Sequence, residues 1–423
     1  MRPFMKRVLC VLAILLAATA VFARGAAEDP DHVNLTFRQN DPPDETGGLF
    51  DSVDEFSEMH DRISVNVESV PWGDALDQFI RESHAGGGPD VLQLAFVWTA
   101  DLGRDGLVMN LDSLIAADPP GAGLDGFLGT ELGTVDGSIY GIPWTVDTFT
   151  IAYRPDLFEE AGISEFPDTW EEFFEAAVVL SEPAGQYGFG FPAGSGSDSG
   201  MWFLVNYYLW SHDKFLVEEH NGEWRIGVTE ADIEEAMRNF NAFFESGASP
   251  RTLIGIDSWG NPELVGGLAR GDFAMSFFPP ATFRASQEQA GGVLETAMVP
   301  RGSVRRVSHL GGRALAINPN TDHPEEAWEL LQHLISRDTF EVYPQFPAQV
   351  PALGELEFGP GEQGYADQLP HAITFDQYIR SPAPVSGMWA ATNRHFGSVY
   401  SGERTPAQAA SALIAELEEL LFD

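Results

Sequence analysis

The sequence predicts an α/β protein in which two sheet-centred lobes are joined by strands that cross between them. The chain has 423 residues, which is enough for two domains with separate cores. Strand and helix patterns alternate along residues 33–95, as in a lobe built on a parallel sheet. The segment 140–154, YGIPWTVDTFTIAYR, begins with aromatic, Gly and Pro residues and continues as a period-two apolar strand. Such a strand could link two lobes and line the gap between them, although one buried strand after a turn fits it equally well.

The first residues have the features of an export signal. Three basic residues precede an apolar run at 8–21, and the run ends in a small-x-small cleavage site, VFA, at 21–23. We therefore expect a signal peptide at 1–23, cleaved near Ala23; a retained membrane helix is the alternative. The only cysteine, Cys10, lies in this run, so the mature protein is expected to have no thiol. No second long apolar span follows, which predicts a soluble exported product.

The chain is strongly acidic. Its formal net charge is −41, and about −44 without residues 1–23. Such a surface repels nucleic-acid phosphates and anionic lipid headgroups, so neither is expected as a partner. Lys6 and Lys214 are the only lysines, against 21 arginines. Abundant Asp and Glu with almost no Lys suggest a halophilic composition, because external salt screens self-repulsion.

The first lobe is expected to begin as a series of strands and helices. Strands are predicted at 33–38, 63–70 and 91–95, and helices at 49–60 and from 72 or 74 to about 83. In open parallel sheets, ligands lie beyond the carboxyl ends of the strands. This rule places Asn40 and Asp41, after the first strand, on the same rim as Phe96 and Trp98, after the third. The sequence Asn40-Asp41-Pro42 is also ordinary turn chemistry.

The middle of the chain predicts further helices of the second lobe. Thr169 and Glu172 form a capping box that opens a helix through Leu180. The glycine-rich segment 194–200, GSGSDSG, lacks both the Lys-Ser/Thr of a phosphate loop and the central Ser of a nucleophile elbow. The segment 201–210, MWFLVNYYLW, predicts a helix over the second sheet. Most of its aromatic residues are expected in the core, with Trp202 at the loop end as the exception.

The second half of the chain predicts an amphipathic helix at 233–244 and a buried strand at 271–278. Pro324 opens one helix, and the capping signature Thr405-Pro406-x-Gln408 opens the last, which runs to 421.

Six segments carry a family resemblance. They are GPDVLQLAFVWTADLGRDGLVMNLDSLI (88–115), YGIPW with TFTIAYR (140–154), FPDTWEEFFEAA (166–177), GDFAMSFF (271–278), GGRALAINPNTDHPEEAWELLQHLIS (311–336) and SGERTPAQAASAL (401–413). In this order, across nearly the whole chain, they resemble the extracellular solute-binding proteins of ABC importers, the family that includes the maltose-binding and other sugar-binding receptors.

The resemblance implies a fold and a function. The fold would be a type II periplasmic-binding-protein-like fold, each lobe a mainly parallel sheet flanked by helices, with three hinge crossings. The second and third crossings would lie at 309–313 and 346–351. The first lobe would hold 31–145 plus 309–345, and the second 146–308 plus 346–423. The function would be a periplasmic or extracellular receptor that closes on a sugar or oligosaccharide and presents it to the transmembrane subunits of an ABC permease. We expect a monomer that is not an enzyme and uses no cofactor or metal.

The candidate ligand contacts follow from the chemistry of a neutral polyol. It offers hydroxyl edges, which match polar side chains, and an apolar C–H face, which matches an aromatic ring. The resemblance places Phe278 near the ligand and Trp389 facing the sugar, although Trp389 could instead fill the core. Arg313 stands where many relatives carry Trp. The candidate faces are Phe96, Trp98, Tyr140, Trp144, Trp202, Phe278 and Trp389, with Trp259 and Phe283 as weaker ones; the candidate edges are Asn40, Asp41, Asp147 and Arg313.

Rival functions remain open at this point. A phosphorylated solute would need more cations than Arg313 and Arg380, and a metal would need a clustered set of ligands, whereas the ten histidines are scattered. A polyamine fits the acidity, while the aromatic content favours a sugar. An exported glycoside hydrolase would need a pair of acids at a defined separation, and the acids are too numerous for any pair to stand out.

Overall fold

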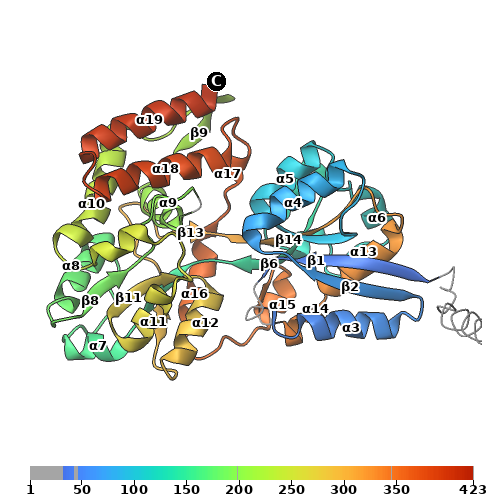
Figure 1. The fold of residues 1–423 in the computed structure, drawn as a ribbon, viewed down its shortest axis with the longest axis horizontal. Helices are drawn as coiled ribbons and strands as arrows, with labels where there is room; N and C mark the ends of the chain where they lie inside the picture. Colours follow the sequence, from blue (N-terminus) through green and yellow to red (C-terminus); the bar gives the residue numbers. More distant parts are fainter. Residues whose placement is uncertain (1–31, 42–45, 198, 344, 423) are drawn as a thin grey trace, which may run out of the picture.

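The computed structural model describes residues 32–41, 46–197, 199–343 and 345–422. These residues form two α/β lobes side by side, joined where strands pass between them (Figure 1). The predicted signal segment, its cleavage near Ala23, and Cys10 lie outside the described residues. Within the ranges described, no helix combines the length and the apolarity needed to cross a bilayer.

The first lobe is built on a six-stranded mixed sheet with the order β15-β6-β14-β3-β1-β2. β1 pairs in parallel with β2 and β3, whereas β14 runs antiparallel to β3 and β6, and β15 runs antiparallel to β6. The strands are β1 (Val33–Gln39), β2 (Ile63–Ser69), β3 (Val91–Ala95), β6 (Ile142–Asp147), β14 (Gly311–Ile317) and β15 (Phe346–Pro347).

Helices cover both faces of this sheet. Figure 1 shows α4 and α5 on one face and α3 and α14 on the other. Because both faces are covered, β3 and β6 are buried along nearly their whole length. The helices are α3 (Leu49–Met59), α4 (Trp72–His84), α5 (Phe96–Arg104), α6 (Asp112–Ala117), α13 (Pro324–Leu334), α14 (Arg337–Val342) and α15 (Val350–Gly354).

The second lobe is built on a four-stranded sheet with the order β12-β7-β11-β8. Only β11 and β8 pair in parallel; β7 is antiparallel to both β11 and β12. The strands are β7 (Thr150–Tyr153), β8 (Tyr187–Gly190), β11 (Phe273–Phe278) and β12 (Glu295–Ala297). The expectation of mainly parallel sheets is therefore corrected to mixed sheets. β14 and β7, which arrive from the other lobe, run antiparallel to their neighbours, and β15 also runs antiparallel to β6.

The helices of the second lobe include one that is buried on every side. All residues of α9 (Met201–Ser211) are buried, because it lies against α10, α18 and the crossing strand β13. This confirms the buried helix that the sequence predicts there. Trp202, expected as the exception to core burial, is buried with the rest of the helix. The other helices are α7 (Pro155–Glu160), α8 (Trp170–Leu180), α10 (Glu230–Glu245), α11 (Pro262–Arg270), α12 (Pro280–Gln289), α16 (Gln363–Gln368), α17 (Asp376–Ile379), α18 (Val385–Tyr400) and α19 (Pro406–Phe422).

Short elements complete the two lobes. The two-residue strand β13, which leads into the second crossing, pairs in parallel with β16. The short strands are β4 (Thr134–Val135), β5 (Ser138–Ile139), β9 (Val217–His220), β10 (Glu223–Ile226), β13 (Ser308–His309) and β16 (Ala372–Ile373), and the 3₁₀ turns are η1 (Leu124–Gly126), η2 (Thr130–Gly133), η3 (Arg251–Gly255) and η4 (Leu369–His371).

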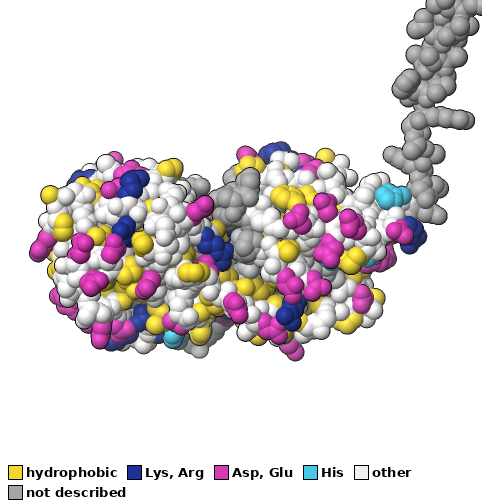
Figure 2. Space-filling model, turned by 90° about the horizontal axis from the view of Figure 1, so that it is seen from below, with side chains coloured by type: hydrophobic (Ala, Val, Ile, Leu, Met, Phe, Trp, Pro, Cys, Tyr) yellow, Lys and Arg dark blue, Asp and Glu magenta, His cyan; other side chains and the backbone are white. Residues whose placement is uncertain are grey.

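Local signals in the sequence are found where they were expected. The capping box at Thr169 is present, with the Glu172 N–H donating to its hydroxyl and the Glu172 carboxylate accepting from the Thr169 N–H. Thr405 and Gln408 cap α19 in the same way. Acidic side chains are spread over both lobes on the face that Figure 2 shows, in keeping with the net charge of −41.

The chain crosses between the lobes at three places, and the third differs from the prediction. The first crossing joins β6 to β7 and the second joins β13 to β14. β15 pairs with β6, and the Leu128 N–H donates to the Ala348 carbonyl, so residues 346–354 lie with the first lobe rather than the second. The chain is back in the second lobe at Gly361, whose carbonyl accepts the Thr296 N–H. The third crossing therefore follows α15.

Trp144 belongs to the core of the first lobe. Its side chain is fully buried, its ring stacks on Tyr343 at 5.0 Å between centroids, and its indole N–H donates to the Leu334 carbonyl over 2.7 Å. The expectation that Trp144 contacts ligand is therefore wrong, because strand alternation does not tell which face of β6 meets the gap between lobes.

We predict that Trp144→Ala destabilises the protein by about 3–5 kcal/mol, because it leaves a large cavity and an unpaired carbonyl. Denaturant unfolding followed by circular dichroism measures the change. Trp98→Ala, which removes a partly exposed ring of the same lobe, serves as the control and should cost clearly less. Equal losses for the two variants would contradict this assignment.

Candidate functional site

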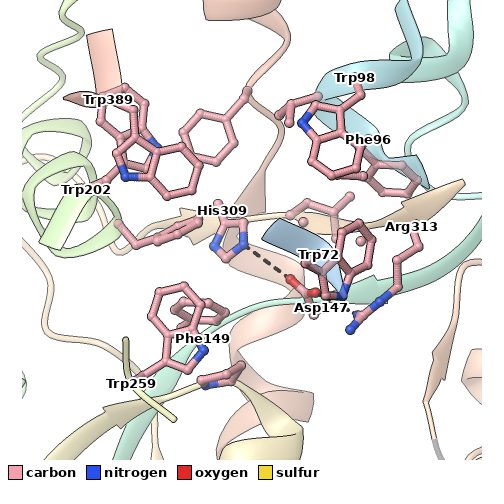
Figure 3. Close-up of a pocket in the computed structure, with 18 of the residues that line it drawn as sticks. Trp72, Phe96, Trp98, Asp147, Phe149, Trp202, Trp259, His309, Arg313 and Trp389 are labelled. Atoms are coloured by element: carbon pink, nitrogen blue, oxygen red, sulfur yellow. Dashed lines mark hydrogen bonds and ion pairs between the residues drawn. The ribbon is translucent and has the colours of Figure 1, made fainter. Parts of the chain in front are cut away.

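A cavity of about 510 Å³ lies between the two lobes. That volume is in the range of small-molecule sites in proteins. Figure 3 shows its aromatic side chains in two groups, one on each lobe, with His309 and Asp147 between them. The cavity is therefore an aromatic-walled gap with a polar centre.

The wall on the first lobe comes from the first turns of two helices. Trp72 is the first residue of α4, and Phe96 and Trp98 lie in the first turn of α5, directly after β3. The rings of Trp72 and Trp98 lie 5.4 Å apart at 57°. Because α5 begins at the carboxyl end of β3, its first aromatic residues point to the rim where ligands lie in open sheets.

The wall on the second lobe contains a stack of three rings. Trp202 lies between Phe375 and Trp389, with centroid distances of 5.9 and 5.7 Å and interplanar angles of 19° and 15°. The Trp389 indole N–H donates to the Ser199 carbonyl over 2.8 Å, which fixes its orientation. Phe149, Phe203 and Trp259 extend this wall, as Figure 3 shows for Phe149 and Trp259.

The polar centre joins both crossing strands. Asp147 ends β6, and one of its carboxylate oxygens lies 3.2 Å from Nε2 of His309 while the other lies 3.2 Å from Nη1 of Arg313. On its far side, His309 hydrogen-bonds through Nδ1 to the Tyr207 hydroxyl of α9. The centre therefore ties the first crossing strand to the second and reaches into the second lobe.

A second carboxylate holds Arg313 from the first lobe. The Asp41 side chain is fully buried and accepts two hydrogen bonds from Arg313, from Nε over 3.0 Å and from Nη2 over 2.8 Å. Asp41 also accepts hydrogen bonds from Trp72, Gln93 and Tyr343. Asp41 therefore positions the arginine rather than lining the cavity.

The environment of Asp147 favours its charged form. Burial opposes ionisation, but the hydrogen bond and attraction to His309 and the attraction to Arg313 outweigh it and hold the pKa of Asp147 below its usual value. Burial raises the pKa of Tyr207 far above the usual range of a phenol, so its hydroxyl stays neutral. The cavity thus holds an ionised carboxylate that is already paired.

The structure brings six of the predicted site residues to the cavity. They come from β3–α5, β6, α9, β14 and α18, and they are Phe96, Trp98, Asp147, Trp202, Arg313 and Trp389. Trp259, a weaker candidate, also lines it. Their contact with a ligand stays a prediction.

Four other candidates are placed away from the cavity lining, besides Asp41 and Trp144. Asn40 is buried, with its backbone N–H and side-chain amide donating to Gln93. Tyr140 packs over Gly103 at the edge of the first lobe's core. Phe278 and Phe283 are fully buried in the second lobe. These expectations are corrected, because a residue that follows a strand can turn inward as readily as towards the rim.

Several residues that line the cavity were not predicted from the sequence. Phe149 and His309 lie in the predicted crossings and could have been found by extending the site along those segments. Trp72 opens a helix after β2 and follows from the same rule as Phe96. Phe375 has no local signal, because it reaches the wall through the pairing of β16 with β13.

The comparisons with known proteins decide the family. The sequence model of the bacterial extracellular solute-binding protein family matches residues 43–339. The chain belongs to this family. A binding role fits a cavity whose polar centre holds charges that are paired with each other. Among the described residues, no group of three or more His, Cys, Asp or Glu side chains is placed to hold a metal ion.

Three proteins that resemble this solute-binding protein match it over most of their length. A binding protein of Brucella abortus (strain 2308) is 25% identical over 328 residues, 77% of either chain. The galactooligosaccharide-binding protein of Bacillus subtilis (strain 168) is 22% identical over 386 residues, 86% of this chain and 85% of its own. The GacH receptor of Streptomyces glaucescens GLA.O, solved unliganded and with acarbose or an acarbose homolog, superposes with a TM-score of 0.78 at 21% identity, over 93% and 99% of the chains. This likeness confirms the predicted type II, two-lobe fold.

We predict that Asp41→Asn destabilises this solute-binding protein by about 3 kcal/mol, because the substitution leaves the largely buried guanidinium of Arg313 without one of its two paired carboxylates. Urea unfolding measures the loss. Glu68→Gln is the matched control: Glu68 pairs with Arg38, but its side chain is 41% exposed, so the change should cost at most about 1 kcal/mol. Similar losses of unfolding free energy for Asp41→Asn and Glu68→Gln would contradict the role of Asp41 in holding Arg313.

The lowered pKa of Asp147 predicts a defined pH dependence. A carboxyl group with a depressed pKa in the folded state stabilises the fold above its unfolded pKa, about 3.9, and this contribution is lost as the pH falls through the folded pKa. Asp147→Asn should therefore lose less stability than the wild type between about pH 5 and pH 2. Parallel stability curves over that interval, measured by urea unfolding, would contradict the pairing described above.

Proposed function

We propose that this protein is an exported sugar receptor of an ABC importer. It captures a neutral sugar or oligosaccharide between the lobes and presents it to the transmembrane subunits of a permease. The observation that supports this most is the cavity itself, where aromatic faces from opposite lobes flank a polar centre. An aromatic ring matches the C–H face of a sugar, and charged and amide groups match its hydroxyl edges.

The pairing of the charges favours an uncharged ligand. Asp147 has two partners, His309 and Arg313, and Asp41 already accepts hydrogen bonds from Arg313. The two carboxylates of the polar centre are thus already paired with cations, which disfavours a polyamine there, and a phosphorylated solute would be better served by more than one cation in the lining. Asp257 also lines the cavity, so a polyamine is included in the test below. Arg313 is the only lysine or arginine among the residues that line the cavity within the described ranges. Relatives named for galactooligosaccharide and solved with acarbose agree with this choice.

The lowered pKa of Asp147 favours a binding role over hydrolysis. The general acid of a glycoside hydrolase needs a raised pKa so that it carries a proton at working pH. The pKa of Asp147 is lowered instead, so it is unsuited to that task. We infer that the protein binds sugar without turning it over.

Closure is the mechanism that we infer for capture. The three crossings allow the first lobe (31–145 with 309–345, extended to 354) to rotate against the second, and a ligand that touches both walls binds the closed form more tightly. The rings of each wall are packed within their own lobe, so closure brings two preformed surfaces together. The closed monomer would then be what the permease recognises, after export directed by residues 1–23.

Isothermal titration calorimetry with glucose, galactose, maltose, lactose and spermidine tests the proposal. We expect at least one sugar to bind without any product detectable by chromatography, and Trp389→Ala to weaken that binding at least about thirtyfold, because it removes a stacking face worth about 2 kcal/mol. Trp224→Ala, which lies on β10 and is not part of the cavity lining, is the control and should bind as the wild type does. Binding of spermidine alone, or sugar turnover, would contradict the proposal.

A further inference from the structure

The glycine-rich segment that lacked a function in the sequence has a structural role next to the cavity. A methyl group added at Gly194 or Gly196 would lie under 3.0 Å from the Asp257 side chain, and one at Gly200 would lie under 3.0 Å from the Trp259 ring. At Gly194 and Gly200 the contact is with the backbone or a packed ring of another loop, which favours glycine, whereas at Gly196 it is with the Asp257 side chain alone. That loop, residues 256–259, lies between η3 and α11.

Hydrogen bonds fix the loop on this glycine backbone. The Gly194 and Gly200 N–H groups donate to the carbonyls of Ile256 and Asp257, each over 2.8 Å. The Gly196 N–H donates over 2.8 Å to Oδ1 of the Asp257 carboxylate. The Gly196 N–H thus holds a carboxylate of the same protein, and the Gly194 and Gly200 N–H groups hold the backbone of the loop.

Three residues of this loop, Asp257, Ser258 and Trp259, line the cavity. The Asp257 residue is exposed, and Trp259 is half-buried. The Trp259 ring meets Phe149 at 4.5 Å and 72°, and Phe203 at 5.4 Å and 73°, so its plane is set by two edge-to-face contacts. Figure 3 shows Trp259 beside Phe149, at the opposite end of this wall from Trp389.

We propose that Asp257 and Trp259 form a sugar subsite, which we call the loop subsite, and that Gly194, Gly196 and Gly200 are its positioning residues. This inference rests on the proposed function. A carboxylate accepts hydrogen bonds from sugar hydroxyls while the indole covers the adjacent C–H face, so one uncharged sugar unit meets both groups at once. The hydrogen bonds to the glycine backbone hold the loop in place before the ligand binds. Binding therefore loses little conformational entropy from ordering this loop.

The loop subsite is separate from the stacked rings at Trp389. Phe203 touches both tryptophans, with its centroid 5.4 Å from Trp259 and 5.3 Å from Trp389. The wall thus offers one aromatic platform on each side of Phe203. The ligand class that uses both is an oligosaccharide of at least two sugar units.

The test measures affinity for maltose and lactose by calorimetry, together with melting temperature. Asp257→Asn keeps an amide oxygen to accept the Gly196 N–H but loses the charge, and we expect at least tenfold weaker binding of the disaccharide that the wild type binds, at an unchanged melting temperature. Gly200→Ala should weaken binding to a similar extent and alter the tryptophan emission spectrum, because the new methyl group displaces Trp259. Trp259→Phe, the conservative variant, should retain more affinity than Trp259→Ala.

Gly255→Ala is the matched control for Gly200→Ala. An added methyl group at Gly255 meets no atom within 4 Å, so this variant should bind as the wild type does. If the wild type binds disaccharide and Asp257→Asn, Gly200→Ala and Trp259→Ala all bind within twofold of it, the loop subsite is overturned while the proposed function stands. If the wild type binds no sugar of the panel, both are overturned.

Discussion

The paired carboxylate of Asp147 is the constraint on which the rest of the site depends. It ends the first crossing strand and is held by His309 and Arg313 of the second, and Arg313 is held in turn by the buried Asp41. A charge at the junction of two lobes is costly unless it is paired. The pairing satisfies that charge, fixes the two crossing strands side by side, and leaves a polar centre whose groups are already oriented.

Each aromatic wall is organised by its own lobe. Trp72 and Trp98 come from neighbouring helix starts of the first lobe, whereas Trp202, Phe375 and Trp389 stack within the second. In the closure that we propose, each wall keeps its shape, movement is concentrated in the short crossings, and the packing of each core does not have to change. This arrangement suits a receptor whose affinity for its ligand comes from bringing two preformed binding surfaces together.

The parts of this account that follow from sequence are the local ones. The capping box at Thr169 and the aromatic residues after β3 were predicted because they depend on neighbours in the chain. Trp144 was misplaced because alternation separates the two faces of a strand without identifying the face that meets the cavity. Phe278 was misplaced because a residue at the end of a strand can turn into the core as readily as towards the rim. Phe375 and the docking of Asp257 on Gly196 depend on residues about 60 positions away in sequence. Contacts between residues that far apart in the chain leave no periodic pattern in the sequence.

Small-angle X-ray scattering with and without saturating sugar tests most directly whether the ligand closes the two lobes. The measurement uses the mature protein and the sugar that calorimetry shows to bind, at a protein concentration where the chain is a single species. The account predicts a smaller radius of gyration for the complex than for the free protein. An unchanged radius of gyration at full occupancy would contradict closure and with it the central claim.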